Sequence, residues 1–68
     1  KNYVRLAGIW KALAETSVSD VQYWKNAAGA YLLMGAKSEA IKILERAISL
    51  NPGFKGEAES LIEDILSQ

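Results

Sequence analysis

The sequence predicts an all-α domain of about four short helices. Apolar residues recur every three or four positions in four successive segments, which is the spacing of one face of a helix. Glycine and proline fall between these segments, where helices are expected to end. Half of the 68 residues are hydrophobic and cysteine is absent, so an apolar core has to stabilise the fold without disulfides.

The first helix is expected within residues 1–19, which carry one apolar stripe. The members of the stripe are Tyr3, Leu6, Ile9, Trp10 and Leu13. Trp10, like Trp24 further along, lies inside a regular stripe, so both indoles are expected to anchor the core rather than to stack on a ligand. The stretch from Thr16 to Asp20 is the expected connector.

The second helix is expected around a stripe that begins at Trp24. The stripe consists of Trp24, Ala27, Ala28 and Tyr31. Ser19 followed by Gln22 fits a capping box at the start of this helix, with Asp20 in its first turn, where a carboxylate interacts favourably with the helix dipole. Gly35 is expected to end the helix, because glycine takes the left-handed cap conformation without penalty.

The third helix is expected to follow Gly35 and to stop at Asn51. Pro52 lacks a backbone donor and disfavours helical geometry in the residue before it. The stripe of this helix alternates small and large residues: Ala40, Ile41, Leu44, Ala47 and Ile48. Because alanines leave room for bulky neighbours, the second and third helices are expected to form an antiparallel hairpin with axes roughly 8–10 Å apart.

The last segment, residues 55–68, predicts a helix with one apolar and one polar side. The apolar side consists of Ala58, Leu61, Ile62, Ile65 and Leu66. The polar side consists of Glu57, Glu59, Ser60, Glu63, Asp64 and Ser67. We therefore expect this helix to place its apolar side against the core and its polar side toward water.

Residues 21–54 resemble one tetratricopeptide repeat, whose pattern W-x-x-L-G-x-x-Y, then A-x-x-x-F, then P extends over about 34 residues. The positions that match are Trp24, Tyr31, Ala40 and Pro52. The positions that depart in size or shape are Ala27, Ala28 and Leu44, in place of the Leu, the Gly and the Phe. The resemblance implies a helical hairpin from an α-α superhelix.

The resemblance also predicts how the flanks are organised. One period upstream, three residues of the first stripe take the places of Ala40, Leu44 and Ala47; they are Leu6, Trp10 and Leu13. The single domain is therefore expected to comprise a degenerate half repeat (residues 1–19) whose first half is missing, a full repeat (20–54) and a capping helix (55–68). A three-helix bundle of unrelated topology is the alternative fold.

Composition argues against several functional classes. Histidine and cysteine are both absent, so the commonest general base, the best nucleophile and most transition-metal ligands are missing. Eight basic and eight acidic residues cancel, which removes the electrostatic basis for nucleic-acid binding, and no apolar run is long enough to cross a bilayer. A soluble, cytoplasmic, non-catalytic protein without cofactor or metal is expected. An enzyme that uses the carboxylates of residues 57–64 is the least favoured alternative.

The resemblance implies a peptide-binding function. In that family, the first helix of each repeat lines a concave groove that binds an extended peptide or a partner's helix. The corresponding residues here are Gln22, Lys25, Asn26, Gly29, Leu32 and Leu33. Lys25 and Asn26 match in kind the residues with which some members bind carboxylate tails, whereas Gly29 stands where those members have an Asn. The alternatives are solvated polar side chains without a ligand, a structural end of a longer array, and a self-association module of a larger, soluble or membrane-anchored protein that forms a homo-oligomer through the first helix.

Leu32, Leu33 and Met34 cannot all face one side of a helix, because each residue turns by about 100°. At least one of them is expected to point away from the Trp24 face. Either it packs under Trp10 or Leu13, or it belongs to an exposed apolar strip that receives a partner's side chain.

Overall fold

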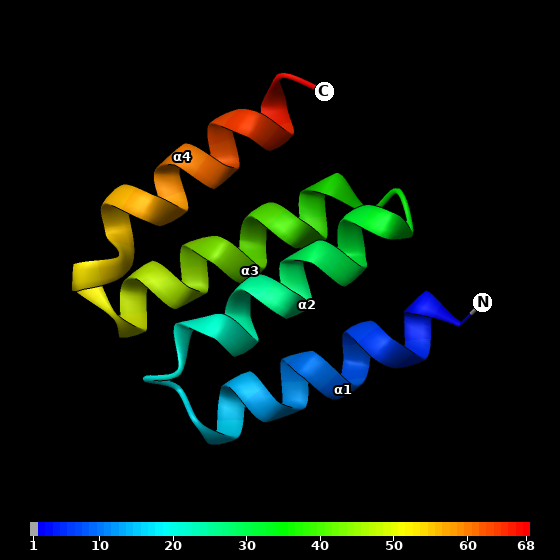
Figure 1. Ribbon diagram of the computed structural model, residues 1–68, viewed down its shortest axis with the longest axis horizontal. Coiled ribbons are helices and arrows are strands. Elements are labelled where there is room, and N and C mark those ends of the chain that lie inside the picture. The colour runs from blue at the N-terminus through cyan, green and yellow to red at the C-terminus, as the bar shows by residue number, and fades with distance from the viewer. Residues whose placement is uncertain (1) are drawn as a thin grey trace.

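The computed structural model describes residues 2–68, which form four α-helices and one short 3₁₀ turn. The elements are α1 (Tyr3–Thr16), α2 (Val21–Leu33), α3 (Lys37–Leu50), the turn η1 (Pro52–Phe54) and α4 (Lys55–Leu66). Each helix runs antiparallel to the one before it (Figure 1). The predicted all-α fold of four helices is confirmed; Lys1, which the prediction includes in the first segment, lies outside the described residues.

The helices form a thin slab with extents of 33 × 30 × 14 Å. In the slab α2 packs against α1 and α3, and α3 packs against α2 and α4. The helices α1 and α4 lie at its two edges (Figure 1). Each edge helix therefore has a side that no other described helix covers extensively.

The helix bounds repeat along the chain. The interval from the start of α1 at Tyr3 to the start of α3 at Lys37 equals the interval between their ends at Thr16 and Leu50. The starts of α2 and α4, at Val21 and Lys55, are separated by the same interval again. Residues separated by this interval thus occupy equivalent places in two successive helix pairs.

The start of α2 differs from the predicted capping box. The N-cap is Asp20, whose carboxylate accepts a hydrogen bond from the backbone N–H of Gln22 at 3.2 Å. Ser19 lies in the turn outside the helix. A carboxylate at the N-cap both bonds a free backbone donor and faces the positive end of the helix dipole, so the helix begins one residue later than the Ser19 prediction places it.

The ends of α2 and α3 follow the prediction. Gly35 has a φ of 81° and donates its backbone N–H to Leu32, while Ala36 donates to Tyr31. This pair of bonds is a Schellman motif, which requires the left-handed residue that glycine supplies. At the end of α3, Asn51 donates to the Ala47 carbonyl, and Pro52 opens the turn η1.

The core lies between α2 and α3 and centres on Trp24, which is fully buried. The Trp24 Nε1 donates to the Val18 carbonyl at 3.0 Å, and the Asn51 Nδ2 donates to the same oxygen at 2.6 Å. The indole therefore fills the core and also links the α1–α2 connector to the end of α3. The prediction that Trp24 anchors the core is confirmed.

The helix α1 packs on α2 through its alanines and not through the leucine side of its apolar stripe. The residues that α1 buries completely are Ala7 and Ala14, which α2 covers. The leucines and isoleucine of the stripe remain exposed, and Trp10 is only half-buried against Tyr23, with ring centroids 5.9 Å apart. An edge helix has a single neighbour, and small residues allow that neighbour to approach closely, so the alanine side packs and the leucine side does not.

Candidate functional site: an apolar hollow between α2 and α4

A hollow of about 300 Å³ opens on the slab between α2 and α4. Its walls are mainly aliphatic, with Leu44 of α3 contributing to the lining. From α2 it is lined by Lys25, Ala28, Gly29 and Leu32, and from α4 and the residues after it by Leu61, Asp64, Ile65 and Gln68. An apolar cavity with a few polar groups at its margin is the usual form of a binding site, and this volume is at the small end of that class.

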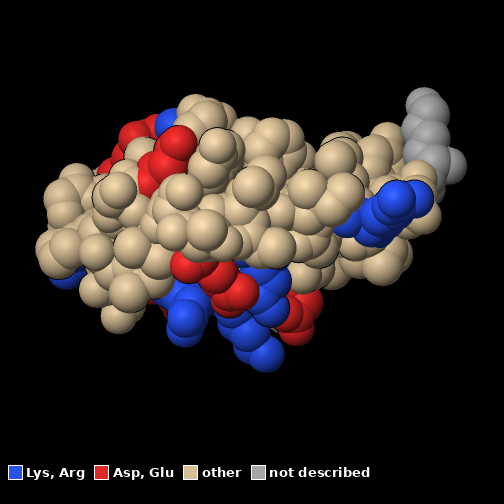
Figure 2. All heavy atoms as spheres, turned by 90° about the horizontal axis from the view of Figure 1, so that it is seen from below, with Lys and Arg blue, Asp and Glu red and all other residues tan. Residues whose placement is uncertain are grey.

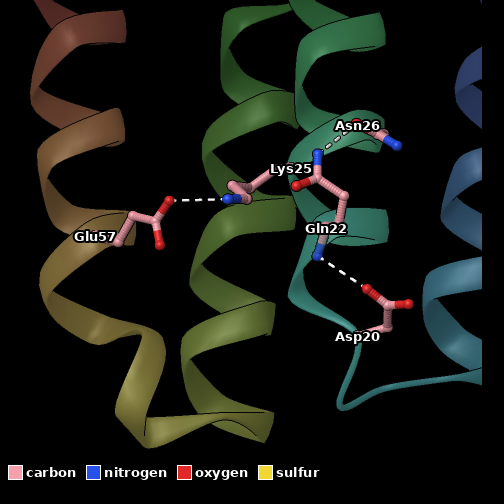
Figure 3. Close-up of polar contacts among 5 residues, drawn as sticks. All are labelled: Asp20, Gln22, Lys25, Asn26 and Glu57. Atoms are coloured by element: carbon pink, nitrogen blue, oxygen red, sulfur yellow. Dashed lines mark hydrogen bonds and ion pairs between the residues drawn. The ribbon is translucent and has the colours of Figure 1, made fainter.

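A salt bridge connects the two helices that form the hollow. The Lys25 Nζ lies 2.9 Å from the Glu57 Oε2 and donates a hydrogen bond to it (Figure 3). The two side chains are 28% and 56% exposed, so the pair stays in contact with water. Exposed pairs of this kind contribute about 0–1 kcal/mol, and a ligand carboxylate can therefore replace Glu57 on the lysine at little cost.

Gly29 has no side chain, which leaves open space above the backbone of α2 in the hollow. A Cβ atom at this position would meet no atom within 4 Å outside the helix itself. Glycine in the middle of a helix costs roughly 0.5–1 kcal/mol relative to alanine. No packing contact in the described chain requires the glycine, and its effect is to leave space over the helix backbone at the point where the hollow opens.

A second hollow, of about 350 Å³, lies on the other side of α2, between α2 and α1. Its lining combines two residues of α1 with five of α2: Leu6, Trp10, Lys25, Asn26, Gly29, Ala30 and Leu33. Leu33 is 64% exposed here, so it belongs to an exposed apolar strip rather than packing under Trp10 or Leu13. Lys25 and Gly29 line both hollows.

The residues predicted to line one groove are divided by α2 between these two hollows. Leu32 faces only the hollow toward α4, and Asn26 and Leu33 face only the hollow toward α1. Gln22 lines neither; its Nε2 donates to the Asn26 Oδ1 at 2.9 Å (Figure 3). This bond occupies the Asn26 carbonyl, while the Lys25 ammonium is occupied by Glu57.

The sequence prediction of the site does not include the wall that α4 contributes to the hollow. Leu61, Asp64 and Ile65 follow one another at spacings of three and one residues, which places them on one side of α4, and Gln68 lies two residues beyond the helix end at Leu66. From the sequence, Asp64 is expected on the solvated polar side. The signal that identifies it is its position between Leu61 and Ile65 on the edge of the apolar stripe, where a helix residue borders both core and solvent.

The acidic residues of α4 do not form a metal site. Within residues 2–68, no group of three or more potential ligand side chains is close enough to bind a metal ion. In the same part of the chain, no helix is both long and apolar enough to cross a membrane.

Comparison of the chain with family models, with curated proteins and with solved structures gives no match in any of the three.

Proposed function

We propose that the chain is a tetratricopeptide-type module that binds another protein and carries out no catalysis. The regular interval between equivalent helix bounds supports this proposal, because that family repeats a helix pair over the same length, about 34 residues. The burial of Trp24, Ala40 and Ala47, three positions at which a repeat of this type packs its two helices, supports it further. The absence of histidine and cysteine favours binding over catalysis.

The ligand is an extended peptide or a helix that inserts an apolar side chain between α2 and α4. The observation that carries this proposal is the open apolar hollow bordered by Leu32, Leu61 and the bare backbone at Gly29. A partner's leucine or phenylalanine side chain placed there covers aliphatic surface that is in contact with water in the free chain. Burial of apolar surface contributes about 25 cal/mol per Å², so a small contact area contributes usefully to affinity.

Lys25 offers a ligand carboxylate a hydrogen-bond donor at the margin of this hollow, whose lining also includes the carboxylate of Asp64. A ligand carboxylate exchanges with Glu57 on the ammonium, and the exchange preserves the number of charge-assisted hydrogen bonds. A tight clamp on a terminal carboxylate is not part of the proposal, because Asn26 lines only the hollow toward α1 and not the proposed site.

The test begins with peptides selected on the 68-residue chain from a random display library. Each selected peptide is labelled with a fluorophore, and its affinity is measured by anisotropy against the wild-type chain and Gly29→Leu. The added leucine side chain fills the hollow, so binding should weaken by about tenfold or more, which corresponds to about 1.4 kcal/mol.

The matched control is Gly8→Leu. Gly8 is also a glycine inside a helix with no atom within 4 Å of its Cβ position, but it lies on α1 and lines neither hollow. The control should bind as the wild-type chain does. Equal affinity of Gly29→Leu and Gly8→Leu for every selected peptide would contradict the assignment of the hollow as the binding site.

A further inference from the structure

The edge helix α1 carries an apolar face that nothing in the described chain covers. Leu6, Ile9 and Leu13 are 39%, 48% and 39% exposed, and we refer to these three residues as the α1 face. Figure 2 looks at the molecule from the α1 side, and the surface there is largely uncharged, with charged residues gathered toward its margins. A contiguous apolar surface of this kind marks an interaction site when a suitable partner exists.

The internal repeat identifies the kind of element that covers such a face. The equivalents of the α1 face in the second helix pair lie on α3 and are Ala40, Ile43 and Ala47. They are 0%, 5% and 0% exposed, and α2 packs against α3. The α1 face therefore corresponds to the side of α3 that a preceding antiparallel helix occupies.

The helix equivalent to α2 in each copy is α4. The α2 residues Ala28 and Leu32 line the hollow together with Leu44 of α3, which places them toward that helix. Their equivalents on α4 are Ile62, which is half-buried, and Leu66, which is 69% exposed. Each copy of the chain thus carries α4 at one edge of the slab and the α1 face, on which a helix like α4 can pack, at the other edge (Figure 1).

Side-chain sizes are exchanged at one end of this pairing. Trp24 of α2 lies near the C-terminal end of α3, because Trp24 and Asn51 both donate to the Val18 carbonyl. The equivalent of Trp24 on α4 is Ala58, and the equivalent of Ala47 on α1 is Leu13. In the α2–α3 pair the large residue, Trp24, is on α2 and the small one, Ala47, is on α3. In the pairing of α4 with α1 the small residue, Ala58, is on α4 and the large one, Leu13, is on α1.

The charges of the two edges are complementary. On α1, Arg5 and Lys11 form no salt bridge with any described residue, and Glu15 is paired with Arg46 at 3.8 Å. On α4, neither Glu59 nor Glu63, which flank Ile62, forms one with any described residue. Antiparallel packing of α4 on α1 brings the C-terminal half of α4, with Glu63, toward Arg5. Complementary charges of this kind orient an encounter and favour it over pairing of two like edges.

We propose that a second copy of the chain docks head to tail, with Ile62 and Leu66 of one copy packed on the α1 face of the next. The two surfaces lie on opposite edges of the slab, so the contact is heterologous. Because such a contact leaves a free edge at each end, assembly continues with rising concentration instead of stopping at a dimer.

Sedimentation equilibrium over a wide range of protein concentration measures this directly. The average mass of the wild-type chain should rise continuously with concentration. Ile9→Glu removes the receiving face and Leu66→Glu removes the inserting helix, so each variant alone should stay monomeric. Both residues are exposed, and circular dichroism should show unchanged helicity.

The decisive sample is an equimolar mixture of Ile9→Glu and Leu66→Glu. Each variant retains the surface that the other lacks, so the mixture should form a dimer of one copy of each and nothing larger. The matched control is Val4→Glu. Val4 is an apolar residue of α1 that is 68% exposed and lies about 140° around the helix from Ile9, so the mass of this variant should rise with concentration as that of the wild-type chain does.

Three outcomes would overturn the proposal. The first is a wild-type chain that stays monomeric at every concentration. The second is a wild-type dimer that Leu66→Glu leaves intact, which indicates symmetric pairing of two α1 faces. The third is a mixture of the two variants that remains monomeric although the wild-type chain assembles.

Discussion

At the scale of single residues, Trp24 has the largest predicted effect on stability. Its side chain is fully buried, and its Nε1 bonds the Val18 carbonyl. Trp24→Ala should cost about 3–5 kcal/mol, which approaches the entire stability of a small domain. Loss of the helical circular dichroism signal at room temperature is the expected result.

A milder substitution separates the two roles of the indole. Trp24→Phe keeps most of the apolar volume but removes the hydrogen bond, so it should cost less than Trp24→Ala and leave a folded protein whose urea midpoint is lower. A melting temperature that is unchanged in Trp24→Ala would contradict the placement of this residue in the core.

Alanine substitutions at two glycines should change the free energy of unfolding in opposite directions, because the backbone conformations of the two glycines differ. Gly29 lies in a helix with open space at its Cβ position, so Gly29→Ala should stabilise the fold by roughly 0.5–1 kcal/mol. Gly35 has a φ of 81°, so Gly35→Ala should destabilise it by roughly 1–2 kcal/mol. Urea unfolding followed by circular dichroism measures both changes; shifts in the same direction would contradict the Schellman end of α2.

At the scale of the helices, the start of α2 distinguishes two candidate caps. Asp20→Ala removes the carboxylate that accepts from the Gln22 N–H and should cost about 0.5–2 kcal/mol. Ser19→Ala changes an exposed residue of the turn and should stay within about 0.5 kcal/mol of the wild-type chain. The free energy of unfolding in urea provides the comparison, and a larger loss for Ser19→Ala would restore the predicted capping box.

The helices also show what the sequence can and cannot predict. Gly35 and Pro52 predict the ends of α2 and α3 because each acts through its own backbone geometry, independently of the rest of the fold. The packing side of α1 is different: the periodicity identifies both a leucine side and an alanine side, and only the position of the neighbouring helix decides which one is buried.

The candidate site was predicted in part for the same reason. Lys25, Gly29 and Leu32 could be identified because they belong to one helix, whose turn fixes their common direction. Asp64 and Gln68 could not, because they reach the hollow only through the packing of α4 on α3, and their polarity alone indicates solvent.

At the scale of the whole molecule, the slab separates two proposed interactions. The peptide hollow opens between α2 and α4, whereas head-to-tail pairing uses the outer sides of α1 and α4. Leu66→Glu should therefore abolish self-association and leave the affinity for a selected peptide unchanged. Sedimentation and anisotropy of this variant test the independence of the two surfaces; a loss of both properties would mean that the surfaces overlap.

The most direct test of the binding hollow is an NMR titration of the ¹⁵N-labelled Leu66→Glu chain with an unlabelled selected peptide, since this variant is expected to remain monomeric. The amide signals of Gly29, Leu32, Leu61 and Asp64 should shift together and saturate at one peptide per chain. The amides of Lys42 and Ser49, on the exposed side of α3, should not move. Saturable shifts that spare the first group and fall elsewhere on the slab would contradict the proposed site.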